Sequence, residues 1–89
     1  MDVENNESLD QFEIKSDGET AFLTYRLGND ILELVHTEVP AALEGHGFGS
    51  ALAAGAFEHA RSHHLRVHPI CSFVKRWLER HPEQRDIVK

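Results

Sequence analysis

Cysteine, positive charge and long apolar runs are all scarce in this chain. Its 89 residues include one cysteine, Cys71, so no disulfide forms within the chain. A lone free cysteine is typical of a reducing compartment, and the sequence predicts a cytoplasmic protein. No apolar run approaches the roughly 20 residues that span a bilayer, and the acidic N-terminus has the wrong charge for a secretory signal. We therefore expect no membrane association and no export.

Negative charge outweighs positive charge. The chain has 9 lysines and arginines against 15 aspartates and glutamates, a formal net charge of −6 with neutral histidines. A nucleic-acid partner needs a basic surface for its phosphates, so we expect none. One phosphorylated cofactor remains compatible, because backbone amides at a helix start bind phosphate without net positive charge. The acidic balance also suits a basic acceptor such as an amine.

Most of the chain has an ordinary globular composition. Hydrophobic residues make up 40% and charged residues 27% of the 89 residues, which suits one domain with a modest core. The stretch Met1–Asp10 differs because it has little apolar surface to bury. The sequence predicts a flexible tail over residues 1–10 and a single domain over residues 11–89. An edge strand of such a small sheet is compatible with a monomer or a weak homodimer.

The first half of the domain has the pattern of strands. Three segments alternate apolar and polar side chains and are joined by turn sequences, the first of which is Asp17-Gly18. In the third segment, period two places Leu32, Leu34 and His36 on one face. The segments are Phe12–Lys15, Thr20–Leu27 and Ile31–Val39. They predict an antiparallel, three-stranded meander.

The second half alternates helix and strand. Pro40 ends the third strand because it has no N–H to donate. Apolar residues recur at helical spacing over Phe48–His63 and again over Cys71–Arg80, and the segment Leu65–Ile70 between them is a short strand. The order β-β-β-α-β-α predicts an α+β fold, with helices packed on a mostly antiparallel sheet.

A glycine-rich loop separates the two halves. Gly45, Gly47 and Gly49 keep side chains away from the surface just before a helix. The amides at that helix start have no partner within the helix and lie at the positive end of its dipole, which suits a pyrophosphate. A dinucleotide fingerprint would need a further glycine at Ser50 or Leu52, and a P-loop would need a lysine. The alternative interpretation is a simple turn.

The motif Glu44-x-x-Gly47-x-Gly49 resembles the acetyl-CoA pyrophosphate motif Q/R-x-x-G-x-G/A of GNAT-type N-acetyltransferases, with glutamate in place of glutamine or arginine. The segments His36–Pro40, Pro69–Val74 and Arg80–Glu83 are similar to those of miniature GNAT-like proteins that lack the usual C-terminal strands. The resemblance covers roughly Phe12–Val88. It implies a minimal GNAT-like fold, acetyl-CoA as acyl donor and an amine acceptor that the sequence does not identify.

The resemblance also implies where the cofactor binds. The loop amides would receive the pyrophosphate, and the end of the preceding strand would pair with the pantetheine arm. The arm would lie where that strand splays away from Leu65–Ile70. No metal is implied. The predicted cofactor-binding residues are Thr37, Glu38, Val39, Gly45, His46, Gly47, Phe48, Gly49, Ser50 and Ser72.

Cys71 and His36 are the predicted catalytic residues. Cys71 stands between a strand and a helix, where thiol pKa values are often lowered, and the resemblance implies that it faces the thioester. It would attack the thioester or protonate the departing CoA thiolate, and the alternative is an inert buried cysteine. The ordinary pKa of a histidine, about 6.5, suits His36 as general base, with His68 as second candidate. For both histidines the alternative is a structural hydrogen bond.

Two further clusters have no assigned catalytic role. His59 and His63 lie four apart on a helix, but no cysteine pair or H-E-x-x-H motif accompanies them, so we predict no metal site. Arg61 and Arg66 form a small positive patch, either a contact for the ribose phosphate or a solvated helix end. Two rival functions stay open: a CoA-binding module without catalysis, and a protein-interaction domain whose glycine loop is only a turn.

Overall fold

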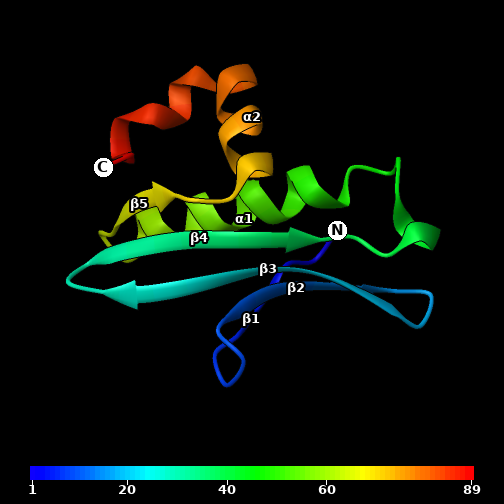
Figure 1. The fold of residues 1–89 in the computed structure, drawn as a ribbon. Coiled ribbons are helices and arrows are strands. Elements are labelled where there is room, and N and C mark those ends of the chain that lie inside the picture. The colour runs from blue at the N-terminus through cyan, green and yellow to red at the C-terminus, as the bar shows by residue number, and fades with distance from the viewer.

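One five-stranded sheet is the frame of the molecule, and a computed structural model describes it over residues 1–89 (Figure 1). The strand order is β1-β2-β3-β4-β5, with antiparallel neighbours from β1 to β4 and a parallel β4–β5 pair. The predicted α+β order is confirmed. The elements are β1 (Glu4–Asn6), β2 (Gln11–Ser16), β3 (Glu19–Gly28), β4 (Ile31–Glu38), the 3-10 helix η1 (Ala41–Leu43), α1 (Phe48–Ser62), β5 (Arg66–Pro69), α2 (Ser72–Arg80) and the 3-10 helix η2 (Pro82–Ile87).

Two tight turns join β2, β3 and β4. Asp17 and Gly18 have φ of 52° and 77°, and Asn29 and Asp30 have φ of 54° and 60°. Paired positive φ values match the right-handed twist of the flanking strands, and glycine, asparagine and aspartate tolerate them best. The hairpins follow directly from local turn chemistry, as the sequence predicts.

The N-terminal residues do not form a free tail, so the prediction for residues 1–10 is wrong at β1. This strand pairs with β2, and Tyr25 Oη donates a hydrogen bond to Asn5 Oδ1 at 2.7 Å. Just before the strand, Val3 packs on α1 where Gly55 has no side chain. A Cβ atom at Gly55 would lie 2.9 Å from Val3 Cγ1. Main-chain pairing with β2 and the packing of Val3 on Gly55 hold this segment in place. The polar composition of the segment predicts neither contact.

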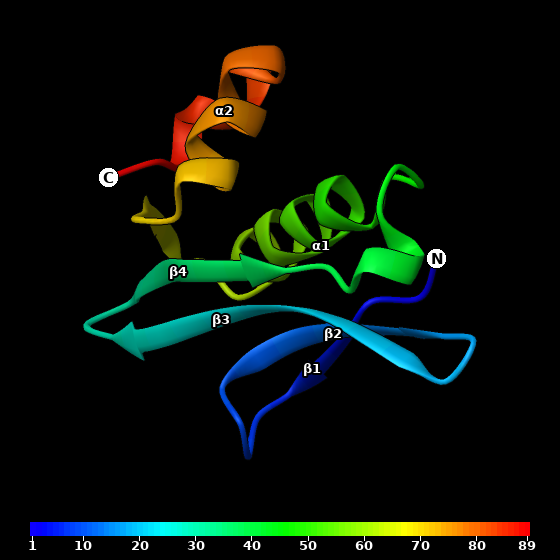
Figure 2. The ribbon, with the colours of Figure 1, turned by 45° about the vertical axis from the view of Figure 1, so that its right-hand side comes forward.

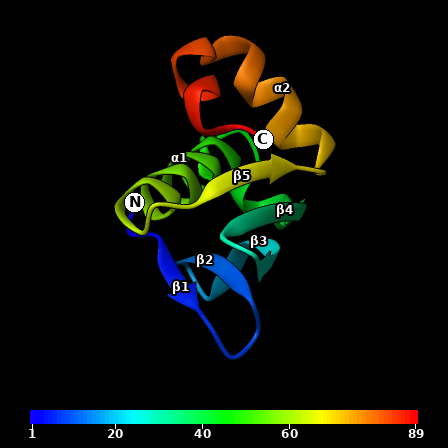
Figure 3. The same ribbon diagram turned by 90° about the vertical axis from the view of Figure 1, so that its left-hand side faces the viewer.

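A single hydrophobic core fills the space between the sheet and the helices. In Figures 2 and 3, α1 lies against the sheet and α2 lies beside β5, far from β1. The rings of Phe57 and Trp77, with centroids 5.2 Å apart, join the two helices. The largest fully buried side chains are Phe12, Phe57, Leu23, Leu32, Leu34, Leu52, Val67 and Val74. Neither helix has the length and apolar character needed to span a membrane.

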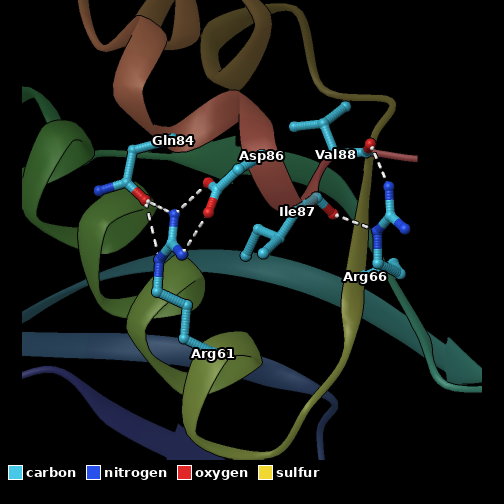
Figure 4. A network of polar contacts seen from close by, with 6 residues as sticks. All are labelled: Arg61, Arg66, Gln84, Asp86, Ile87 and Val88. Carbon is cyan, nitrogen blue, oxygen red and sulfur yellow. Dashed lines mark hydrogen bonds and ion pairs between the residues drawn. The ribbon is translucent and has the colours of Figure 1, made fainter.

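Two arginines hold the C-terminal segment (Figure 4). Arg61 makes paired contacts with the carboxylate of Asp86, at 2.6 and 2.9 Å. Arg66 donates to the carbonyl oxygens of Ile87 and Val88 at 3.1 and 2.9 Å, beside a parallel bridge between Val88 and β5. The positive patch seen in the sequence is therefore engaged with the protein's own C-terminus.

Candidate functional site

A β-bulge near the end of β4 decides which side chains face the helices. Tyr25 pairs with Leu34, whereas Thr24 pairs with His36, so Val35 is an extra residue without an opposite partner. An extra residue reverses the alternation of side chains beyond it. The prediction that His36 shares a face with Leu34 is therefore wrong, because period two assumes an unbroken ladder.

Beyond the bulge, Thr37 faces inward and its two neighbours face outward. Thr37 lies opposite Leu23, which is fully buried, so both share the face covered by the helices. His36 and Glu38 lie on the outer face, where His36 Nε2 and Glu38 Oε1 are 3.0 Å apart and both side chains are more than half exposed. His68 is also exposed and pairs in register with Glu33. The structure therefore does not bring either histidine into contact with Cys71.

The strands β4 and β5 part immediately after their last pair. Their ladder ends at Leu34 and Pro69, and the carbonyl oxygen of Leu34 accepts hydrogen bonds from the amides of both Ile70 and Cys71, each at 2.9 Å. Proline ends such a ladder because it has no N–H. From here β4 continues to Glu38, while the other chain turns into α2. The last residues of β4 therefore have no strand partner on this side.

Cys71 lies at the point where the two strands part. It is the N-cap residue of α2, it is 7% exposed, and its Sγ atom is 3.3 Å from Thr37 Oγ1. Burial raises the pKa of the Cys71 thiol. The Thr37 hydroxyl and the amides of Val74, Phe73 and Thr37 outweigh that effect, so the pKa is lowered overall. No capping hydrogen bond joins the Cys71 side chain to the first turn of α2.

The glycine loop presents a run of amides without partners. Gly45 and Gly47 have φ of 79° and 81°, which glycine adopts without strain, and Gly47 is the N-cap of α1. The amides from Gly45 to Ser50 donate no hydrogen bond within the protein, and the first satisfied amide is that of Ala51, to Gly47 O at 3.0 Å. No side chain caps α1 and no acidic residue lies in its first turn. These amides are available to an anion.

Gly49 is required for a different reason than Gly47. Its φ is ordinary, but a Cβ atom there would lie 2.6 Å from Cζ of Phe73. At Gly47 nothing lies within 4 Å of an added Cβ. Gly49 lets the start of α1 approach α2 closely, whereas Gly47 permits the backbone turn and leaves open space in front of the loop.

A cavity of about 510 Å³ joins these parts. It lies between the end of β4, the glycine loop and α2, and includes every predicted cofactor-binding residue except His46 and Ser72, both of which are exposed. Its lining residues are Thr37, Glu38, Val39, Leu43, Glu44, Gly45, Gly47, Phe48, Gly49, Ser50, Phe73 and Arg80. Cys71 does not line this cavity and touches it only through Thr37. A larger hollow of about 820 Å³ lies between the N-terminal segment and α1, but it contains none of the loop residues.

Sequence reasoning missed two side chains that α2 contributes to the cavity, Phe73 and Arg80. Their spacing of seven residues puts them on the same face of the helix, and that was the available signal. The position of α2 relative to the loop, which the sequence alone does not give, decides that this face points into the cavity. Glu44 also lines it, so the residue that departs from the motif brings a carboxylate to the site.

The histidines do not assemble a metal site. The rings of His59 and His63 stack with centroids 4.1 Å apart. No group of three or more His, Cys, Asp or Glu side chains is arranged to hold a metal ion. The helical spacing of these two residues therefore produces a ring contact.

Comparison with known proteins defines first the class and then the family. The fold is similar to the NMR solution structure of a GCN5-like protein from Staphylococcus aureus, with a TM-score of 0.76 and 32% identity, covering 99% of this chain and 87% of that one. A model described as GCN5-related N-acetyl-transferase matches residues 11–87. The chain belongs to this GNAT family, and so to the acetyltransferases.

Curated relatives agree with this family. The chain is 32% identical to Protein NATD1 of Bos taurus over 83 residues, which covers 90% of this chain and 74% of the relative. It is 31% identical to Protein NATD1 of Gallus gallus over 85 residues, which covers 92% of this chain and 77% of the relative. The likeness therefore extends over nearly the whole chain.

Proposed function

We propose that this protein binds acetyl-CoA in the 510 Å³ cavity and transfers the acetyl group to an amine. The observation that carries the proposal is the run of unpartnered amides from Gly45 to Ser50, which shares this cavity with the unpaired end of β4. Backbone N–H groups at a helix start bind phosphate, and an unpaired strand end binds amide groups of an extended ligand.

The residues present fit this ligand. The space in front of Gly45 and Gly47 is open, so a pyrophosphate has room to reach the amides. Thr37 and Val39 lie at the end of β4, where main-chain groups would pair with the amides of the pantetheine arm. Glu44 is the one unfavourable residue, because its carboxylate would repel a phosphate.

Cys71 would act at the thioester. Its contact with Thr37 connects it to the cavity, and the Thr37 hydroxyl beside Sγ favours the thiolate. As nucleophile, Sγ would bond to the acetyl carbon while the carbon–sulfur bond to CoA breaks and CoA leaves as a thiolate. The amine would then attack the acetyl carbon, the bond from that carbon to Sγ would break, and the amine proton would pass to the general base. As general acid, Sγ–H would instead give its proton to the departing CoA thiolate.

His36 remains the proposed general base, and this role would constrain the direction from which the acceptor approaches. Because His36 lies on the outer face, the amine would have to approach from that face. Glu38 Oε1, 3.0 Å from His36 Nε2, would orient the ring.

Isothermal titration of acetyl-CoA and CoA tests the proposal, with Gly47→Trp as the blocking variant. Its matched control is Gly18→Trp, because Gly18 has a similar φ of 77° and also has nothing within 4 Å of an added Cβ, but lies in a hairpin far along the chain. We expect the unsubstituted protein and the hairpin variant to bind both ligands and the loop variant to bind neither. Equal binding by all three proteins, with circular dichroism showing them folded, would contradict a site at the loop.

A binding module without catalysis is the second candidate, and the carboxylate of Glu44 in the cavity favours it. Turnover separates the two functions. An acetyl acceptor screen in which the unsubstituted protein releases CoA, and Cys71→Ala does not, supports the transferase. Tight CoA binding with no release of CoA in the presence of any amine supports the binding module.

A further inference from the structure

The arginines of this chain differ in whether they have partners within the protein. Arg26 pairs with Glu33 at 2.8 Å, Arg61 with Asp86, and Arg66 with two C-terminal carbonyl oxygens. Arg76, Arg80 and Arg85 make no hydrogen bond or ion pair with the rest of the protein, and of these three only Arg80 lines the cavity. An arginine presents five N–H donors in a planar fork that matches phosphate oxygens.

The cavity needs such a cation. Its charged lining residues are Glu38, Glu44 and Arg80, so Arg80 is its single positive side chain. The loop amides carry only partial positive charge, and the carboxylate of Glu44 opposes an anionic ligand. The carboxylate of Glu38 instead contacts His36 on the outer face. In the GNAT motif the position of Glu44 is basic or an amide, so this chain has lost that contribution from the loop and has a cation on α2 instead.

The backbone of Arg80 is held in a fixed place relative to the loop. Its helix is anchored by Val74, Trp77 and Leu78, all buried in the core. The ring of the next residue, His81, stacks on Trp77 with centroids 4.3 Å apart, and its Nδ1 lies 2.9 Å from the carbonyl oxygen of Trp77. These contacts fix the last turn of α2. The backbone of Arg80 therefore has a defined position beside the cavity, and only its side chain moves.

We propose that Arg80 binds the phosphate groups of the ligand held at the Gly45–Ser50 loop. Its guanidinium would replace the basic or amide side chain that the motif usually has at the position of Glu44. This inference rests on the proposed function. Under this inference, the phosphate site has two sides: the loop amides on one and Arg80 of α2 on the other. The shared chemistry is a phosphate oxygen. On CoA it belongs to the pyrophosphate or to the 3′-phosphate of the ribose.

The test measures the affinity of the folded protein for CoA and for dephospho-CoA by calorimetry, at low and high salt. The variants are Arg80→Ala, Arg80→Lys and the control Arg76→Ala. Arg76 is exposed on the same helix, has no ion pair, and does not line the cavity. Because Arg80 has no partner in the protein, we expect both alanine variants to keep the melting temperature of the unsubstituted protein.

We expect Arg80→Ala to weaken CoA binding about tenfold, which is the effect of losing one charge-assisted hydrogen bond, and Arg76→Ala to leave it unchanged. Arg80→Lys should be intermediate, because it keeps the charge and loses the fork. The salt dependence of binding should become flatter in Arg80→Ala, because one screened attraction is gone. An equal loss for dephospho-CoA assigns the contact to the pyrophosphate, and a loss confined to CoA assigns it to the 3′-phosphate.

Two results overturn this inference alone. One is an Arg80→Ala variant that binds CoA as tightly as the unsubstituted protein, with the same salt dependence. The other is an equal weakening by Arg76→Ala, which would reveal only a general effect of charge. If the unsubstituted protein does not bind CoA at all, the proposed function fails and this inference fails with it.

Discussion

The two sides of the molecule differ in how many of their polar groups have partners within the protein. From β2 to β4, hairpins pair the strands along their length, and side chains such as Leu23 are fully buried. From the end of β4 to α2, the ladder stops at Leu34, the loop amides lack acceptors, and Arg80 has no partner. In the proposed function, the unsatisfied groups around this cavity bind the ligand, and the paired half is the scaffold that holds them in place.

The largest expected effect lies in the paired half. Leu23→Ala in β3 should lower the free energy of unfolding by about 2–5 kcal/mol, since it leaves a cavity in a fully buried site. Leu27→Ala on the same strand, where the side chain is 56% exposed, should change it by less than about 0.5 kcal/mol. Urea unfolding followed by circular dichroism measures both. Similar losses in the two variants would contradict the placement of the core.

The second effect tests the contact between the loop and α2. Gly49→Ala should destabilise the protein by about 1–3 kcal/mol, because its Cβ would meet the ring of Phe73 at 2.6 Å. Combining it with Phe73→Leu, which removes the clashing ring, should recover part of the loss. Thermal unfolding of the two single variants and the double variant gives the coupling. Strictly additive losses would show that the two residues do not meet.

The third effect concerns the pKa of Cys71. Thr37→Val removes a hydroxyl that favours the thiolate, so the pKa of the Cys71 thiol should rise. Thr24→Val is the control, because its hydroxyl contacts the carbonyl oxygen of His36 instead. The ultraviolet absorption of the thiolate during a pH titration reports the change. An unchanged titration in Thr37→Val would contradict the contact.

The same lowered pKa has a consequence for stability. A folded pKa below that of the unfolded chain means that unfolding takes up protons between the two values. The contribution of Cys71 to the free energy of unfolding is therefore fully present above the unfolded pKa and is lost as pH falls through the folded pKa. In Thr37→Val this dependence on pH should become weaker.

The smallest expected effect is a gain. Glu44→Gln removes a carboxylate from the cavity and restores a residue typical of the motif. CoA binding should tighten about two- to fivefold, the size expected for one partly screened charge. Glu58→Gln is the control, because Glu58 is exposed on α1 and does not line this cavity. Calorimetry at low salt measures both, and weaker binding by Glu44→Gln would show that the carboxylate helps.

The hairpins and the glycine loop were predictable because each follows from local chemistry. Asp17-Gly18 and the loop glycines specify their backbone conformation within a few residues. The bulge at Val35 was not predictable, because it depends on how β3 and β4 pair across the sheet. It moves His36 to the outer face and Thr37 toward Cys71, so one extra residue rearranges the predicted catalytic pair.

The other misses have the same nonlocal origin. The strand β1 depends on main-chain pairing with β2 and on the space above Gly55, neither of which its polar sequence records. The place of Arg80 in the cavity depends on the packing of α2 against α1. Sequence patterns located the loop, whereas only tertiary packing shows that α2 lines the opposite side of the cavity.

The most direct measurement of the central claim is an NMR titration of the isotope-labelled protein with acetyl-CoA, following the glycine amides. We predict large shifts at the loop amides of Gly45, Gly47 and Gly49, with little change at the hairpin glycines Gly18 and Gly28. That result would show that the amides without partners in the protein are the ones that receive the ligand. Shifts that are absent, or as large in the hairpins as in the loop, would contradict the claim that this cavity is an acetyl-CoA site.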